Sequence, residues 1–122
     1  MARRTDPDQG RIAVQGWIQH VGPTAAELSR ATLATAVRYT LQLLAARAPG
    51  AAVEVRVPPY GVVQCVAGPR HTRGTPPAVI ETDPHTWLSL ATGRTGWRQA
   101  VDGGTLSASG ERTDLSGWLP LI

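Results

Sequence analysis

Hydrophobic and polar residues alternate over residues 53–57 (VEVRV), which is the period of a half-buried β-strand. Residues 58–61 (PPYG) favour a tight turn, because proline fixes φ and glycine accepts positive φ. Residues 62–66 (VVQCV) predict a second and more buried strand, and residues 79–82 a third. The chain therefore predicts a small antiparallel sheet whose apolar face the remaining elements must cover.

A long amphipathic helix is predicted from Thr24 to Ala48, where alanine and leucine dominate. Thr24 and Glu27 have the spacing of a capping box, and Pro49 with Gly50 ends the helix. Four apolar residues form one stripe along this helix, namely Leu33, Val37, Leu41 and Leu44.

Shorter elements are predicted before the long helix and after the strands. A short helix over residues 11–21 would present Ile12, Trp17 and Val21 to the core, and residues 1–10 read as a flexible tail.

After the sheet, Asp83 and Pro84 start a helix that stops at Gly93. A helix over residues 96–102 would bury Trp97, Ala100 and Val101. A strand over residues 105–110 would turn Leu106 and Ala108 to one side, and Asp114 could cap a last helical turn. This order predicts an α+β fold in a single domain, residues 11–122.

Composition supports a globular domain without identifying a nucleic-acid partner. The 122 residues are 42% hydrophobic and 17% charged, with a net charge of +3. All twelve basic residues are arginines, and they are scattered along the chain. Phosphate binding needs a concentrated basic face, so we do not expect nucleic-acid binding.

The chain has no apolar run near the roughly 20 residues of a membrane-spanning helix. Arg3 and Arg4 are not followed by the apolar segment of a secretory signal. Cys65 is the single cysteine and cannot form an internal disulfide. These features together predict a cytoplasmic protein.

Catalytic and metal sites receive little support. Cys65 and His71 could act as nucleophile and base with Asp83 orienting them, but a thiol inside an apolar strand is inert. His20, His71, His85 and Cys65 lack the short spacing of a structural zinc site. We therefore expect neither an enzyme nor a bound metal or cofactor.

The C-terminal half resembles a known family in three blocks. The helix WLSLATG (residues 87–93) is followed by a short helix with Trp97 and Ala100, then by a glycine turn and a strand ending SASG. The segment VEVRVPPYGVVQCVAGPRHTRGTPP is similar as well, and its RHTRGTPP part is the most specific. Over residues 24–120 the chain resembles the sterol carrier protein family, in its small actinobacterial branch of bacterial orthologues.

This resemblance implies a curved antiparallel sheet of four or five strands with helices on one face. It also implies an apolar cavity between them that binds a fatty acyl or sterol-like lipid without catalysis, with at most transient membrane contact. The residues that it places along this cavity are Leu33, Val37, Leu41, Val55, Val63, Ile80, Trp87, Leu88, Trp97 and Leu106.

The loop over residues 68–77 is longer and more polar than a hairpin needs. Its donors could hold a carboxylate or phosphate head group at the mouth of such a cavity. Alternatively, its arginines could pair with Glu81, Asp83 or Glu111 and brace the fold. The head-group candidates are Arg70, His71, Thr72, Arg73 and Thr75. A second hypothesis for the whole protein is an interaction module of the same fold with a closed cavity, docking a protein partner through RHTRGTPP.

Overall fold

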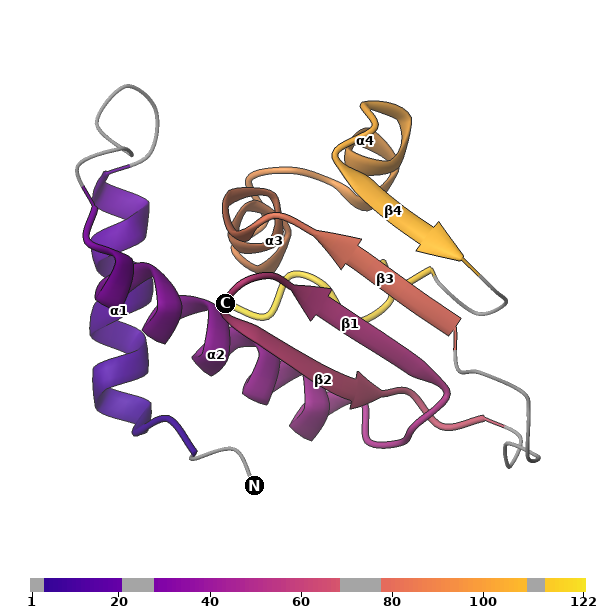
Figure 1. The fold of residues 1–122 in the computed structure, drawn as a ribbon, viewed down its shortest axis with the longest axis horizontal. Helices are drawn as coiled ribbons and strands as arrows, with labels where there is room; N and C mark the ends of the chain where they lie inside the picture. The colour runs from indigo at the N-terminus through magenta and orange to yellow at the C-terminus, as the bar shows by residue number, and fades with distance from the viewer. Residues whose placement is uncertain (1–3, 21–27, 69–77, 110–113) are drawn as a thin grey trace.

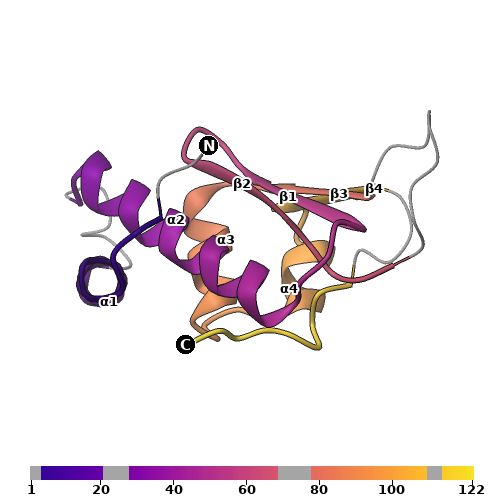
Figure 2. The same cartoon turned by 90° about the horizontal axis from the view of Figure 1, so that it is seen from below.

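The computed structural model describes residues 4–20, 28–68, 78–109 and 114–122. A four-stranded sheet forms one layer, and the helices lie on one face of it (Figures 1 and 2). The helices are α1 (Pro7–Gln19), α2 (Arg30–Arg47), α3 (Pro84–Ala91) and α4 (Trp97–Asp102). The strands are β1 (Val53–Val57), β2 (Gly61–Cys65), β3 (Ala78–Thr82) and β4 (Leu106–Ser109). The predicted α+β class, with helices on one face, is confirmed.

The sheet has the strand order β2-β1-β3-β4 and is mixed. β1 pairs with β2 and β3 with β4 in antiparallel fashion, whereas β1 and β3 are parallel with Val55 opposite Ile80. The prediction of an antiparallel sheet is therefore wrong for the central pair. The segment 66–77 between β2 and β3 is long enough to carry the chain past β1, which a parallel partner requires.

β2 is an edge strand and was wrongly predicted to be the more buried strand of the hairpin. Its residues alternate between half-buried and exposed before Cys65, and Val62 is 55% exposed. The position explains the exposure, because β2 has a neighbouring strand on one side only. Val63 points inward, toward α2, and packs against the core.

The long helix α2 begins later than its predicted capping box. Ser29 is the N-cap, and its hydroxyl accepts a hydrogen bond from the backbone N–H of Thr32 at 3.1 Å. Thr24 and Glu27 lie outside the described residues. The predicted apolar stripe is confirmed, since Val37, Leu41 and Leu44 are buried and Leu33 packs against the core.

α1 begins at Pro7, inside the segment predicted to be a tail, and Asp6 caps it by accepting from the Gln9 backbone N–H. Trp17 is buried as predicted, but Ile12 is 65% exposed and points away from the core. The buried face of α1 is instead formed by Gly10, Ala13, Val14 and Trp17, whose i, i+3, i+4, i+7 spacing places them on one side of the helix.

α3 starts as predicted, with the Asp83 carboxylate accepting from the Thr86 backbone N–H at 3.1 Å. In α4 and β4 the predictions are only partly correct. Ala100 and Leu106 are buried and Trp97 packs against the core, but Val101 and Ala108 are exposed.

The C-terminal segment, residues 114–122, contains the predicted last turn, closed by a 3.0 Å hydrogen bond from the Trp118 N–H to the Leu115 carbonyl, but the turn does not continue into a helix. The Asp114 carboxylate accepts from the Ser116 backbone N–H, and hydrogen bonding to Ser116 lowers the pKa of Asp114. The segment runs along the side of the helices that faces away from the sheet (Figure 2). Leu115 is fully buried there, and Arg47 donates hydrogen bonds to the carbonyls of Pro120 and Leu121.

Candidate functional site

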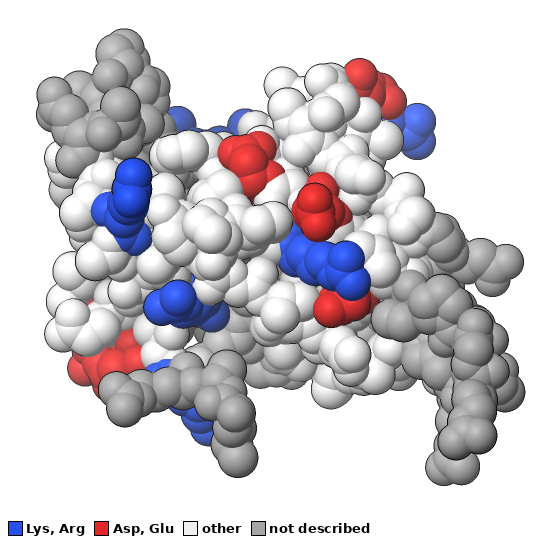
Figure 3. Space-filling model, in the orientation of Figure 1, with Lys and Arg blue, Asp and Glu red and all other residues white. Residues whose placement is uncertain are grey.

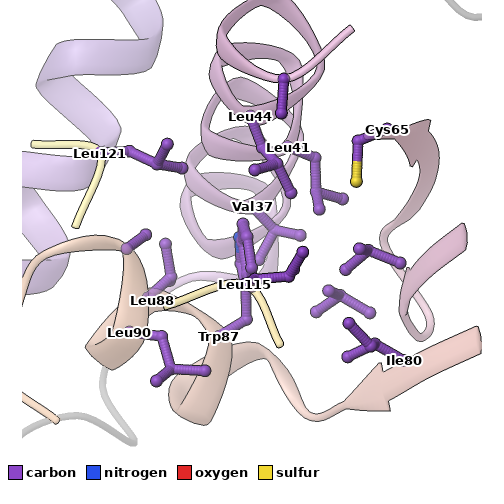
Figure 4. Close-up of a cluster of buried hydrophobic side chains, with 14 of the residues drawn as sticks. Val37, Leu41, Leu44, Cys65, Ile80, Trp87, Leu88, Leu90, Leu115 and Leu121 are labelled. Atoms are coloured by element: carbon purple, nitrogen blue, oxygen red, sulfur yellow. The ribbon is translucent and has the colours of Figure 1, made fainter. Parts of the chain in front are cut away.

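The ten residues predicted to line a cavity come together in one hydrophobic cluster. Seven are buried in it, and Leu33, Val63 and Trp97 are half-buried and pack against it. Figure 4 shows side chains of the sheet, α2, α3 and the C-terminal segment converging between the two layers, with Leu115 among them. The buried members are Val37, Leu41, Val55, Ile80, Trp87, Leu88 and Leu106.

An open groove lies at the edge of this cluster, between α2 and the edge strand β2. Its volume is about 550 Å³, within the range of small-molecule binding sites. Leu41 and Val63 are the two predicted cavity residues that line it. The full lining is Arg4, Thr5, Arg38, Leu41, Gln42, Ala45, Tyr60, Gly61, Val62 and Val63.

One side of the groove is a stripe of α2. Arg38, Leu41, Gln42 and Ala45 follow the i, i+3, i+4, i+7 spacing that puts side chains on one helical face. The Gln42 side chain is held by the backbone of Thr5: its carbonyl oxygen accepts from the Thr5 N–H at 3.0 Å, and its amide donates to the Thr5 carbonyl at 3.4 Å. The segment before α1 is thereby fixed against the groove.

The other side is the start of β2, which approaches α2 closely. A side chain at Gly61 would place its Cβ only 2.9 Å from Leu41 Cδ1, so the absence of a side chain permits this approach. Arg38 spans the two elements, because its Nε donates to the Tyr60 carbonyl at 2.8 Å. A helix, a strand and a turn therefore form the walls of the groove.

The groove carries positive charge without a negative partner. Arg4 and Arg38 lie in its lining, which contains no carboxylate. Within the residues that the structure describes, the ion pairs are Arg11–Asp8 and Arg56–Glu54, so neither arginine of the groove is paired. The site therefore combines apolar residues of α2 and β2 with two arginines that pair with no carboxylate among the described residues.

Two further hollows are smaller and differ in chemistry. One of about 390 Å³ lies on the uncovered face of the sheet, with Glu54, Arg56 and Glu81 in its lining. Acidic and basic side chains are interspersed over that face rather than gathered by sign (Figure 3). The other, of about 380 Å³, lies between α3 and α4 and is lined mainly by hydroxyl, amide and imidazole groups.

His85 lies at that polar hollow and also links α3 to α1. The Trp17 indole N–H donates to His85 Nδ1 at 3.1 Å, so Nδ1 is the acceptor nitrogen of this imidazole. His85 is thus tied to Trp17 rather than to Cys65, which lies on β2.

The residues that were considered and disfavoured as catalytic or metal-binding groups fall partly within the described structure. Cys65 is fully buried, and burial raises the pKa of its thiol from an ordinary 9.0 to about 11, which keeps it protonated and unreactive. Over the residues that are described, no three His, Cys, Asp or Glu side chains are grouped closely enough to hold a metal ion. His71 lies outside the described residues.

The head-group candidates of the polar loop, residues 70–73 and 75, also lie outside the described residues. Of the ten groove residues, only Leu41 and Val63 were among the predicted site residues, and the other eight were missed. The spacing of residues 38, 41, 42 and 45 was visible in the sequence, but the two polar members read as the solvent face of the helix.

A comparison with known protein families shows to which family the chain belongs. The family model described as the bacterial SCP orthologue, where SCP stands for sterol carrier protein, matches residues 29–121. The chain belongs to this family. No curated protein matches it. The match begins at the N-cap of α2 and includes β1 to β4. It covers the groove residues of α2 and β2, whereas Arg4 and Thr5, before α1, lie outside it. In the described parts of the chain, none of the helices has the length and hydrophobicity to cross a bilayer.

Proposed function

We propose that this SCP orthologue is a non-enzymatic carrier that binds a fatty acyl or sterol-like lipid, in agreement with its family. The groove between α2 and β2 carries the proposal, because it joins the apolar interior to the surface at Leu41 and Val63. Each methylene removed from water there would contribute ~0.8 kcal/mol to binding. The protein would act in the cytoplasm and touch membranes only transiently.

The predicted interior cavity and the groove are neighbouring parts of one site in this proposal. Leu41 is buried in the core cluster and also lines the groove, so an acyl chain in the groove would rest on the core surface. The polar loop, residues 68–77, stays a candidate for head-group binding, and its alternative role is to brace the fold.

Native mass spectrometry of gently purified protein tests the carrier function, with an organic extract of the same sample analysed beside it. Ala45→Leu should reduce the fraction of protein that carries a lipid-sized adduct, since Ala45 is half-buried in the groove wall. Ala46→Leu is the matched control, because Ala46 is the next residue and faces solvent. Equal adducts in both variants would place the ligand elsewhere. An apo mass for the wild type, with no rise in Tm from fatty acids, acyl-CoAs or sterols, would contradict the carrier function.

The tight packing of the interior supports the second candidate, an interaction module of the same fold. Leu115 and Trp87 are both fully buried where the two layers meet (Figure 4), which is the arrangement expected of a closed core. Such a module would dock a protein partner through RHTRGTPP. Retention of that partner by Ala45→Leu, together with its loss on replacing Arg70 and Arg73 by alanine, would favour this candidate.

A further inference from the structure

We infer that the groove between α2 and β2 selects single-chain anionic amphiphiles, and that Arg38 is the residue that binds their head group. This inference rests on the proposed carrier function and adds the ligand class and the recognition residue. The decisive feature is the order of residues along α2, where Arg38, which has no described carboxylate partner, is followed by the apolar residues Leu41 and Ala45.

The polarity of the groove matches that of an amphiphile. Arg38 is at one end of the α2 stripe, and Leu41 and Ala45 continue it toward the C-terminal end of the helix. Residues 38 and 45 are seven positions apart, about 10 Å along the helix axis at roughly 1.5 Å per residue. Val62 and Val63 provide apolar surface on the opposite wall. A chain that lies in the groove with its charged end at Arg38 therefore meets Leu41, Ala45 and the two valines, while the Gln42 amide beside them is already hydrogen-bonded to the Thr5 backbone.

The hydrogen bond from Arg38 to the Tyr60 backbone orients the guanidinium group for binding an anion. Its Nε donates to the Tyr60 carbonyl at 2.8 Å, which fixes the guanidinium across the groove and leaves the terminal NH₂ groups available. A guanidinium binds a carboxylate or phosphate through paired, charge-assisted hydrogen bonds. Arg4 lies in the same lining and adds a second positive charge. No described carboxylate competes for either arginine within ion-pairing distance.

The same chemistry disfavours neutral lipids. A sterol offers one neutral hydroxyl, whose hydrogen bond to a guanidinium is weaker than that of an anion. An ester of a fatty acid has the same chain but no negative charge. The groove should therefore distinguish an acid from its methyl ester, although both bury the same apolar chain.

Isothermal titration calorimetry with decanoate and methyl decanoate tests this inference, with cholesterol as the sterol probe. Wild-type protein should bind decanoate roughly tenfold more tightly than its methyl ester, the scale of one partly exposed charge-assisted contact. Arg38→Glu should abolish this preference. Arg30→Glu is the matched control, since Arg30 is exposed on the same helix, lies outside the groove and gives the same charge change. Arg38→Lys, which keeps the charge, should retain part of the preference if the loss in Arg38→Glu is not due to unfolding.

The outcomes separate the inference from the function on which it rests. Equal affinity for acid and ester, or binding of cholesterol alone, would overturn the inference and leave the carrier function standing. Equal losses in Arg38→Glu and Arg30→Glu would show a general charge effect and remove the role of Arg38. If none of the three probes binds, the proposed function itself fails.

Discussion

At the level of single residues, the interior contains a buried hydrogen bond between Trp87 and Thr40. The Trp87 indole N–H donates to Thr40 Oγ1 at 2.8 Å, and the Thr40 hydroxyl donates in turn to α2 carbonyls, those of Ala36 at 2.8 Å and Val37 at 2.9 Å. Both side chains are fully or almost fully buried. The indole therefore has a polar partner where water cannot reach it.

We expect Thr40→Val to lower the free energy of unfolding by about 1–3 kcal/mol, because it leaves the Trp87 N–H buried without an acceptor. Thr35→Val is the control: Thr35 also donates to a carbonyl of its own helix but accepts no indole, so its effect should stay within about 0.5 kcal/mol. Urea denaturation measures both. Equal stabilities of the two variants would show that the Trp87–Thr40 contact contributes nothing specific.

Hydrogen-bonded pairs such as this one cannot be predicted from the sequence, although the burial of the tryptophans can. Trp17 is buried as its expected helix predicts, and Trp87, which the family resemblance places along the interior cavity, is buried as well. Their partners, His85 and Thr40, are 68 and 47 residues away along the chain and read as ordinary polar residues. Only the packing of α1 and α2 against α3 brings these groups together.

At the scale of elements, α1 stands apart because it precedes the region that the family model matches. It is nevertheless well anchored. Trp17 bonds to His85 on α3, and the Arg94 guanidinium lies 5.9 Å from the centroid of the Trp17 ring. Gly10 lies against the ring of Tyr39 on α2, where an added methyl group would overlap the ring.

Two glycines in α1 allow this anchoring to be tested in opposite directions. Gly10→Ala should destabilise the protein by about 1–3 kcal/mol, because the new methyl group would displace Tyr39 or the helix. Gly16→Ala should stabilise it by about 0.5–1 kcal/mol, since its Cβ would lie 3.7 Å from the nearest atom, in Thr32, and alanine favours the helix. Thermal unfolding followed by circular dichroism measures both variants. A Gly10→Ala variant as stable as Gly16→Ala would mean that α1 does not pack on Tyr39 in solution.

The start of α1 shows why the boundaries of short helices are difficult to predict. Asp6 followed by Pro7 is a good helix start, as Asp83 followed by Pro84 proved to be. The apolar residues of α1 are sparse, however, and its buried face includes glycine and alanine. The hydrophobic periodicity therefore predicted a helix only from residue 11 onward.

At the scale of the whole molecule, the sequence predicted the fold class, the β1–β2 hairpin and the position of the helices on one face. It did not predict the parallel pairing of β1 and β3, because strand periodicity does not encode which neighbour a strand selects. The groove likewise results from the strand order of the sheet. It exists because β2 became the edge strand beside α2, and this depends on the topology rather than on any local pattern.

Methyl-resolved NMR of leucine- and valine-labelled protein, titrated with decanoate, would show whether the groove between α2 and β2 is where the lipid binds. A ligand in the groove should shift the methyl signals of Leu41, Val62 and Val63, which line it, and leave that of Leu115 in the interior little changed. Shifts confined to interior methyls would place the chain in a cavity between the layers and contradict the groove. The absence of any methyl shift at saturating decanoate would contradict the binding of single-chain anionic lipids at this site.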